Sequence, residues 1–189
     1  MRAVVGLGNP GPEYALTRHN LGFWVVDRLR AAGRWRRVLF PWGELFLEGD
    51  RTLLKPLTYM NRSGEAVRAL LAFRPLTPRD ILLVHDDVDL PTGAVRLRER
   101  GGDGGHLGVR SVIAALGTED VPRLKLGIGP KPEGVDLADY VLSQPQGEEL
   151  ERLRAAVAFA AEVAAAFLEG GYAAALRIHS RGAAAGKEV

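Results

Sequence analysis

The feature that most constrains the fold is a pair of short, almost wholly apolar segments, residues 2–7 and 80–85, each of which leads directly into a polar cluster. Apolar runs of this length, bounded by turn-forming or charged residues, are typical of buried strands. The first run is followed by Leu21, Val25 and Leu29, whose spacing of four forms one apolar helical stripe. Buried strands that alternate with such helices predict an open α/β sheet.

Further elements continue this alternation, and no repeat or linker divides them. A chain of 189 residues, 47% of them apolar, suffices for one sizeable hydrophobic core. We therefore expect a single domain over residues 1–189, with a basic C-terminal tail at 177–189 that frays. The other expected elements are strands at 36–40, 44–47, 52–55, 94–98 and 124–128, a helix with Ala66, Leu70 and Phe73, and helices at 108–116 and 147–169.

Arginine dominates the cationic residues. All but four of the 25 Lys and Arg residues are Arg, and the pI is about 9.1 although the formal net charge is only +2. The planar guanidinium suits phosphate, so this surplus fits a polyanionic partner; genome composition or heat adaptation explains it equally well. The absence of cysteine excludes disulfides and zinc–thiolate sites. No apolar run approaches the roughly 20 residues of a membrane span, and the N-terminus enters a strand rather than a signal peptide, so we expect a cytoplasmic protein.

Polar side chains gather just after the first predicted strand. Asn9, Tyr14, Arg18, His19 and Asn20 lie within a dozen residues of one another. Asn20 occupies the position of an N-cap for the following helix, so His19 is held between a strand and a helix. A lone histidine in such a place is usually part of a polar surface loop. This density of hydrogen-bonding groups instead favours an active-site loop.

The same segment contains the run GLGNPG at 6–11, which also fits the G-x-G-x-x-G fingerprint of dinucleotide-binding sites. That fingerprint needs backbone N–H donors around a pyrophosphate and a helix that opens at the last glycine. Pro10 and Pro12 each remove a donor, and the residues after Gly11 have no helical period. A Rossmann-type oxidoreductase is therefore a secondary hypothesis, which binding of a nicotinamide cofactor would test.

A second polar cluster, residues 86–89, follows the strand at 80–85. In open α/β sheets the site lies beyond the carboxyl ends of the strands, so we expect this cluster to face Asn9 and its neighbours. His19 beside Asp86 would pair a general base with a carboxylate that fixes its tautomer and stabilises the imidazolium. No serine or cysteine stands in a G-x-S-x-G context, which favours direct attack by an activated water.

The groups around that pair suggest oxyanion donors and also a competing metal site. Asn9 and Asn61 are the candidate side-chain donors to a developing oxyanion. A metal site competes with the His–Asp interpretation, because His85 and the carboxylates of residues 86, 87 and 89 are hard ligands close together in the sequence. Residues 85, 87 and 89 would share one face only if the strand continued, and Pro91 indicates that it is ending.

Five motifs, in this order and at this spacing, resemble the bacterial peptidyl-tRNA hydrolase family over residues 1 to about 143. The motifs are GLGNPGPEYALTRHNLG, KPLTYMNRSGEAV, ILLVHDDVDLPTG, GGDGGHLGVRS and RLKLGIGP. The resemblance implies a single α/β domain with a twisted mixed sheet flanked by helices. It also implies a monomeric esterase that needs no metal or cofactor, and that cleaves the ester between a peptide and the 3′ end of tRNA so that the tRNA returns to translation.

The resemblance also implies roles for individual residues. By the family's pattern His19 is the general base and Asp86 its orienting partner, while Asn9 senses the acylated amino group. Contacts with the peptidyl part or the 3′ end of the substrate, and a basic pair that clamps the tRNA 5′-phosphate, complete the expected set. The substrate contacts are Tyr14, Tyr59 and Asn61, and the basic pair is Arg98 and Lys125.

One position departs from the family's pattern. After Gly104-Gly105-His106 the family commonly has asparagine, which binds substrate and helps to position a water, whereas this chain has Leu107. Leucine neither donates nor accepts a hydrogen bond, so that contact is either absent or supplied by a neighbour such as His106 or Asp103. The glycines around Asp103 predict a mobile loop that can act as a lid.

A non-catalytic RNA-binding module is the remaining alternative, because the arginine-rich surface suits RNA with or without turnover. The presence of both His19 and Asp86 argues against it. Affinity for tRNA without hydrolysis would support it.

Overall fold

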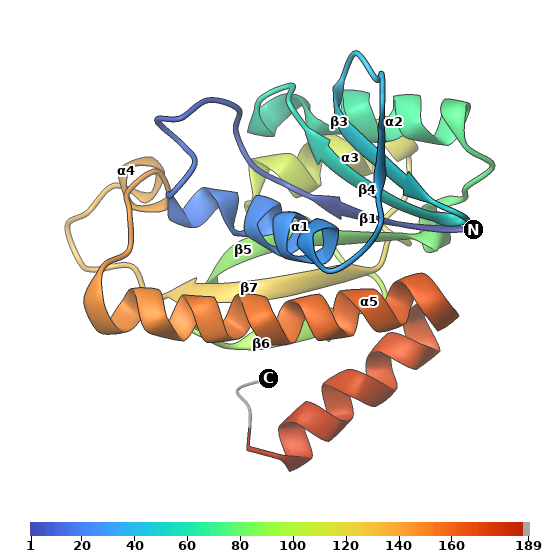
Figure 1. Ribbon diagram of the computed structural model, residues 1–189. Coiled ribbons are helices and arrows are strands. Elements are labelled where there is room, and N and C mark those ends of the chain that lie inside the picture. Colours follow the sequence, from blue (N-terminus) through green and yellow to red (C-terminus); the bar gives the residue numbers. More distant parts are fainter. Residues whose placement is uncertain (187–189) are drawn as a thin grey trace.

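A mixed sheet of seven strands forms the centre of the computed structural model, which describes residues 1–186 (Figure 1). The central pairs β4–β1, β1–β5 and β5–β7 are parallel, and the pairs β2–β3, β3–β4 and β7–β6 towards the edges are antiparallel. The predicted mixed α/β sheet is therefore confirmed. In spatial order the strands are β2 (Arg36–Val38), β3 (Gly43–Glu48), β4 (Arg51–Pro56), β1 (Arg2–Gly6), β5 (Ile81–Pro91), β7 (Arg123–Gly129) and β6 (Val95–Arg98).

Helices cover both faces of this sheet. The helices α1 (Leu21–Ala31) and α5 (Gly147–Ala184) pack on one face, and α2 (Ser63–Phe73) and α3 (Leu107–Leu116) pack against each other on the other face (Figure 1). Alternate residues of a strand therefore enter different cores: Val4 belongs to the α1/α5 core and Val5 to the α2/α3 core. Burial on both faces explains why β1 is apolar at consecutive positions.

Two glycines bring α1 into direct contact with the central strands. A Cβ atom on Gly22 would lie 2.3 Å from the carbonyl oxygen of Val84 and 2.5 Å from the amide nitrogen of Leu7. A Cβ atom on Gly6 would in turn lie 2.1 Å from the carbonyl oxygen of Gly22. Only glycine permits this approach, which holds the first turn of α1 beside the end of β1 and the middle of β5.

The 3₁₀ turn η1 (Arg18–Asn20) immediately precedes α1, and it is the element that contains His19. Between β1 and η1 the chain forms a turn and bends rather than a helix. The glycine-rich run at 6–11 therefore does not open a helix at Gly11, as a dinucleotide fingerprint requires.

The strand β5 is longer than expected, because it runs on to Pro91 instead of ending at His85. Regular pairing with β7 extends through Asp87, and the register shifts between Asp87 and Pro91. The partner strand thus supplies hydrogen bonds beyond the apolar run, which the sequence pattern does not reveal. Asp86 consequently lies within a strand and not in a loop.

The C-terminal part of the chain also differs from expectation. The helix α5 runs to Ala184, beyond its predicted end at Glu169, with a change of direction at Gly171, whose φ is 75°, so residues 177–184 are helical (Figure 1). The segment after Gly171 packs back on the protein: His179 Nε2–H donates to the carbonyl oxygen of Val95 at 2.8 Å, and Gly182 lies against Phe159. The last residues of the expected tail, 187–189, lie outside the described part.

One short helix escaped prediction, namely α4 (Leu137–Val141), which Asp136 caps by accepting from the backbone N–H of Asp139. Five residues are too few for a helical period to be recognised. None of the helices within residues 1–186 combines the length and hydropathy that crossing a membrane requires.

Candidate active site

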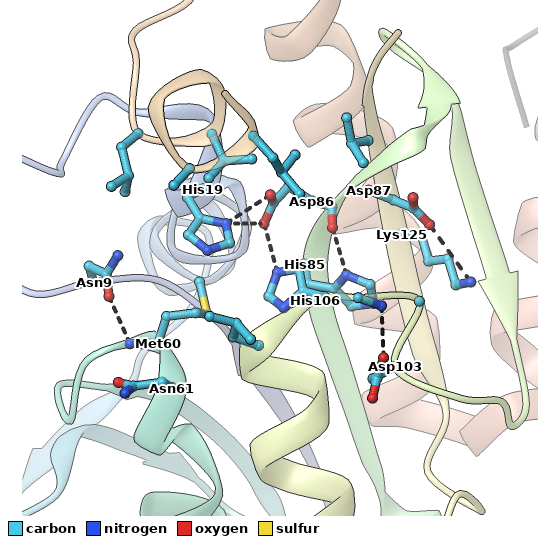
Figure 2. A pocket seen from close by; sticks show the side chains of 18 of the residues that line it. Asn9, His19, Met60, Asn61, His85, Asp86, Asp87, Asp103, His106 and Lys125 are labelled. Carbon is cyan, nitrogen blue, oxygen red and sulfur yellow. Dashed lines mark hydrogen bonds and ion pairs between the residues drawn. The ribbon is translucent and has the colours of Figure 1, made fainter. Parts of the chain in front are cut away.

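His19 and Asp86 meet where the end of β1 and the middle of β5 lie beside the first turn of α1. The Nδ1–H group of His19 donates to the Asp86 carboxylate, with distances of 2.9 Å to Oδ2 and 3.1 Å to Oδ1 (Figure 2). The Asp86 side chain is only 3% exposed and that of His19 12%. The predicted pair is therefore formed, and Nε2 is the His19 nitrogen that remains available to accept a proton.

The two groups shift each other's protonation. Burial lowers the pKa of His19, but the negative charge of Asp86 and its hydrogen bond raise it more, so the pKa ends above its ordinary value of 6.5. Burial raises the pKa of Asp86, but the neighbouring His19 and His106, each with an N–H donor to the carboxylate, outweigh burial and leave this pKa well below its usual range. Asp86 is thus a permanent anion that favours the imidazolium form of its partner.

His106 is a second donor to the same carboxylate. Its Nε2–H group lies 3.0 Å from Oδ1 of Asp86 (Figure 2). Its Nδ1 atom accepts from the backbone N–H groups of Gly108 and Val109 at 3.1 and 3.3 Å, so the ring is the N-cap of α3. Sequence reasoning missed this contact with Asp86. The available signal was the position of His106 directly before a predicted helix.

A third histidine, His85, contacts the backbone of the same aspartate. Its Nδ1–H group donates to the carbonyl oxygen of Asp86 at 2.8 Å, and its buried Nε2 has no partner within the described residues. Burial, together with the proximity of His106 and Arg123, lowers the pKa of His85 to about 3. His85 is therefore neutral at physiological pH and adds no charge to the centre.

A cavity of about 480 Å³ opens onto this cluster. The short helix α4 and its C-terminal neighbour Leu142 form an apolar wall of the cavity, and polar groups from the ends of the strands line the rest. A mainly apolar cavity with a few convergent polar groups is typical of a site for an organic substrate. Of the predicted site residues, the cavity brings together Asn9, Tyr14, His19, Tyr59, Asn61, Asp86 and Lys125, whereas Arg98 is not among its lining residues.

Asn9 is held rigidly on three sides. Its backbone N–H donates to Asn20 Oδ1 and its carbonyl accepts from Asn20 Nδ2, each at 2.9 Å. Its side-chain oxygen accepts from the backbone N–H of Met60 at 2.7 Å, which leaves the amide nitrogen pointing away from that contact (Figure 2). Asn9 therefore offers the cavity a donor and not an acceptor.

The side chain of Asn20 does not cap α1, contrary to the prediction. Asn20 does occupy the N-cap position of α1, but its side chain makes no capping hydrogen bond. The side chain is buried and is used to fix the backbone of Asn9. Tertiary contacts thus override the local capping preference at this position.

Tyr59 stands out among the remaining cavity residues. It is the non-glycine residue with positive φ in the described part of the chain, at 66°, and its side chain is 53% exposed. Such a conformation costs of order 1–3 kcal/mol and tends to occur at functional sites. It directs the chain into the turn η2 (Met60–Arg62), which places Asn61 beside the cavity.

The two basic residues of the predicted phosphate clamp lie on one sheet face. Arg98 of β6 is paired with Arg123 of β7, and Lys125 is two residues further along β7, so their side chains are diagonal neighbours. Arg98 is exposed, while Lys125 lies 3.7 Å from Asp87 at the rim of the cavity. Arg96, directly opposite Lys125, belongs to the same face and was not predicted.

Within residues 1–186, the His, Asp and Glu side chains that could share a metal ion are His19, Asp86 and His106. Both histidine nitrogens that point at Asp86 carry protons in the network above, and a metal on Nε2 of His106 would require a proton on Nδ1, where two N–H groups already donate. These residues therefore fit proton transfer better than metal binding. The predicted alternative set does not converge either, since His85 is turned to a backbone carbonyl and Asp87 to Lys125.

The glycine-rich loop offers no obvious replacement for the asparagine that Leu107 displaces. Leu107 lines the cavity and is 49% exposed. Both ring nitrogens of His106 are engaged, and Asp103 accepts from the N–H of Gly105 and pairs with Arg110. The two neighbours that we considered as substitutes therefore already have partners.

Comparison with known proteins gives a consistent result. The profile of the family described as Peptidyl-tRNA hydrolase matches residues 3–185. The chain is similar to the peptidyl-tRNA hydrolase of Thermotoga petrophila, 51% identical over 147 residues that cover 77% of this chain and 79% of that protein. It is 52% identical over 170 residues to the one of Synechococcus sp. (strain JA-3-3Ab), covering 84% of this chain and 75% of that protein. The crystal structure of peptidyl-tRNA hydrolase from Acinetobacter baumannii superposes with a TM-score of 0.86 at 34% identity, over 94% of this chain and 93% of that one.

Proposed function

Because this chain belongs to the peptidyl-tRNA hydrolase family, we propose that it hydrolyses peptidyl-tRNA at the cavity described above, with His19 as general base. The reaction releases free tRNA and a peptide with a new carboxylate. The single observation that supports the assignment most is the buried His19–Asp86 hydrogen bond at the cavity floor. The fold and the nearby polar groups allow each further step to be assigned to a named side chain.

The chemical step needs one proton transfer in each direction. With Nδ1–H bound to Asp86, Nε2 of His19 accepts a proton from a water as its oxygen attacks the ester carbonyl. The tetrahedral intermediate then expels the ribose oxygen of the tRNA, which takes the same proton back from Nε2. Asp86 stabilises the transient imidazolium and keeps its own negative charge throughout.

Asn9 is assigned a selective role as a hydrogen-bond donor. Its oxygen is engaged by Met60, so only its N–H groups face the substrate. A peptidyl substrate presents amide carbonyls that can accept, whereas the ammonium of an unblocked aminoacyl-tRNA presents donors alone. Asn9 therefore favours N-blocked substrates, and Asn61, Tyr14 and Tyr59 line the space for the peptide and the 3′ end.

The acceptor stem of the tRNA is assigned to the sheet face of β6 and β7. Arg98 and Lys125 supply a pair of cations there, beside the opening of the cavity. Phosphate contacts of this kind supply affinity more than transition-state stabilisation. All of these groups come from one chain, which supports action as a monomer.

The experiment that tests this assignment compares His19→Ala and Arg98→Ala in hydrolysis of N-acetyl-aminoacyl-tRNA. The His19 variant loses the base, so kcat falls by about 10²–10⁴-fold while the melting temperature stays close to that of the wild type. The Arg98 variant loses a phosphate contact, so mainly KM rises. An equal loss of kcat in both variants would refute this division of roles, and tRNA binding without turnover by the wild type would favour a binding module.

A further inference from the structure

We propose that His106 is a positioning residue that is held as the neutral Nε2–H tautomer by the N-terminus of α3, and that in this form it fixes the Asp86 carboxylate for His19. The inference rests on the function proposed above and deepens it, because it assigns a role to a histidine at the same centre. The observation behind it is that one ring joins a helix N-terminus to the catalytic carboxylate.

The tautomer follows from the partners of the two ring nitrogens. Nδ1 lies 3.1 Å and 3.3 Å from the backbone nitrogens of Gly108 and Val109, which can only donate. Nδ1 must therefore be the unprotonated acceptor, and the single ring proton is on Nε2, 3.0 Å from Asp86 Oδ1. A second proton on Nδ1 would face two N–H groups and the positive end of the helix dipole. The capped helix thus favours the Nε2–H tautomer of His106.

The backbone around His106 supports the same placement. Its own N–H donates to the carbonyl oxygen of Asp103 at 2.9 Å, and its side chain is only 9% exposed. Its ring packs against His19, with centroids 4.9 Å apart, and against His85 at 4.8 Å. A protonated His106 would place a second positive charge beside the imidazolium that forms on His19 during catalysis.

With this tautomer of His106, Asp86 accepts from two N–H donors, one from each histidine, while only His19 gains and loses a proton during catalysis. Removing the donor from His106 frees the carboxylate to rotate and leaves more of its negative charge directed at His19. The rotation misplaces His19, and the added charge stabilises its imidazolium. Other charged and titratable groups line the same cavity and stay in place in such a variant. They are His19, His85, Asp86, Asp87, Asp103, Arg123 and Lys125. Arg110 of α3 pairs with Asp103.

Two substitutions separate the two contacts of the ring. His106→Asn keeps an acceptor near the position of Nδ1 and is a favourable N-cap, but its short side chain has no donor that reaches Asp86. His106→Gln keeps a donor near the position of Nε2 and caps poorly. We expect the Asn variant to retain the melting temperature and to lose about tenfold in kcat, with the acid limb of its pH profile moved to higher pH. The Gln variant should melt lower and retain more of kcat.

The readouts include one that does not depend on activity. The ¹⁵N chemical shifts of the His106 ring in the wild-type protein distinguish protonated from unprotonated ring nitrogens. Between about pH 5.5 and 8 they should show a protonated Nε2 and an unprotonated Nδ1. A protonated Nδ1, or wild-type kcat and acid limb in His106→Asn, would overturn the proposal. So would losses of kcat in both variants that simply follow their melting temperatures. Absence of turnover by the wild type would instead refute the proposed function, and the ring shifts would still test the tautomer.

Discussion

At the scale of single residues, Asp86 is the point on which the site converges. Its carboxylate accepts from His19 and His106, and its backbone carbonyl accepts from His85. Burial without these donors would raise its pKa and leave it partly neutral. Because the donors are present, the aspartate stays ionised and sets the basicity of His19.

The raised pKa of His19 gives a prediction for the pH dependence of activity. The base must be neutral to accept a proton, so the acid limb of kcat/KM should have its midpoint above the ordinary value of 6.5. Activity should thus rise with pH, whereas the contribution of His19 to the free energy of unfolding should fall. A raised pKa contributes stability that is present at low pH and is lost as the pH rises through the folded-state pKa. Rates measured from pH 5 to 9 would check the prediction, and a midpoint below 6.5 would contradict it.

Part of this site could be predicted from residue types alone. His19 and Asp86 could be paired because each follows an apolar run, and these two runs form neighbouring parallel strands whose last paired residues are Gly6 and Val84. The contacts of Asn20 with Asn9 and of His106 with Asp86 could not be predicted, because they depend on how different elements pack together. Local propensity predicts that the Asn20 side chain caps α1, which it does not, and gives no sign that His106 caps α3.

At the scale of elements, the close approach of α1 to β1 and β5 positions His19. The approach depends on Gly6 and Gly22, whose backbones face each other without side chains between them. Buried Arg18 adds a second anchor: its guanidinium pairs with Glu149 of α5 at 2.6 Å and donates to the carbonyl oxygen of Tyr140 in α4. The turn that contains His19 is thus fixed to the sheet and to the wall of the cavity.

Substitution of Gly22 tests this positioning. In Gly22→Ala the new methyl group would meet backbone atoms of Val84 and Leu7, which cannot move aside, so α1 must shift. We expect a loss of about 1–3 kcal/mol in the free energy of unfolding, together with a lower kcat because His19 moves relative to Asp86. Arg28→Ala, at an exposed position of the same helix, is the matched control. Denaturant titration and steady-state kinetics would check both effects; wild-type stability and kcat in Gly22→Ala would argue against them.

Element boundaries were the least predictable part. The strand β5 continues past His85 because β7 lies beside it, and the sequence of β5 alone contains no sign of that neighbour. The second part of α5 is helical because it packs back on the body near Val95 and Phe159. Both differences arise from tertiary contacts that override local patterns.

At the scale of the whole molecule, the two faces of the sheet have different tasks. The face under α1 and α5 is covered by the larger apolar core, whereas the β6–β7 end of the other face presents Arg96, Arg98 and Lys125. Two of the many arginines, Arg96 and Arg98, thus lie on the sheet face beside the cavity. This placement supports the polyanion interpretation without excluding heat adaptation for the other arginines.

Salt dependence tests the assignment of that face to the tRNA. Arg98→Ala removes one phosphate contact, so KM should rise, and the slope of log(kcat/KM) against log[salt] should become shallower by about 0.7–0.9. Arg154→Ala, at an exposed position of α5 in the opposite layer, is the control and should leave the slope unchanged. Rates over a series of salt concentrations would check this; equal slopes for the wild type and Arg98→Ala would place the tRNA elsewhere.

The alternation of strands and helices made the α/β class predictable, and the spacing of five motifs made the family predictable. The strand order β4-β1-β5-β7 could not be predicted, because it depends on which strands pair across crossovers rather than on any local pattern.

The central claim is that the His19–Asp86 centre hydrolyses N-blocked aminoacyl-tRNA, with Asn9 as the group that recognises the block. The most direct test measures release of free tRNA from N-acetyl-aminoacyl-tRNA by the purified protein in EDTA, beside the unblocked aminoacyl-tRNA and with Asn9→Asp as a near-isosteric variant. We predict rapid hydrolysis of the blocked substrate alone by the wild type, and a smaller difference between the two substrates in Asn9→Asp, because an acceptor replaces the donor. Hydrolysis of both substrates alike by the wild type, or activity only after a divalent ion is added, would contradict the account.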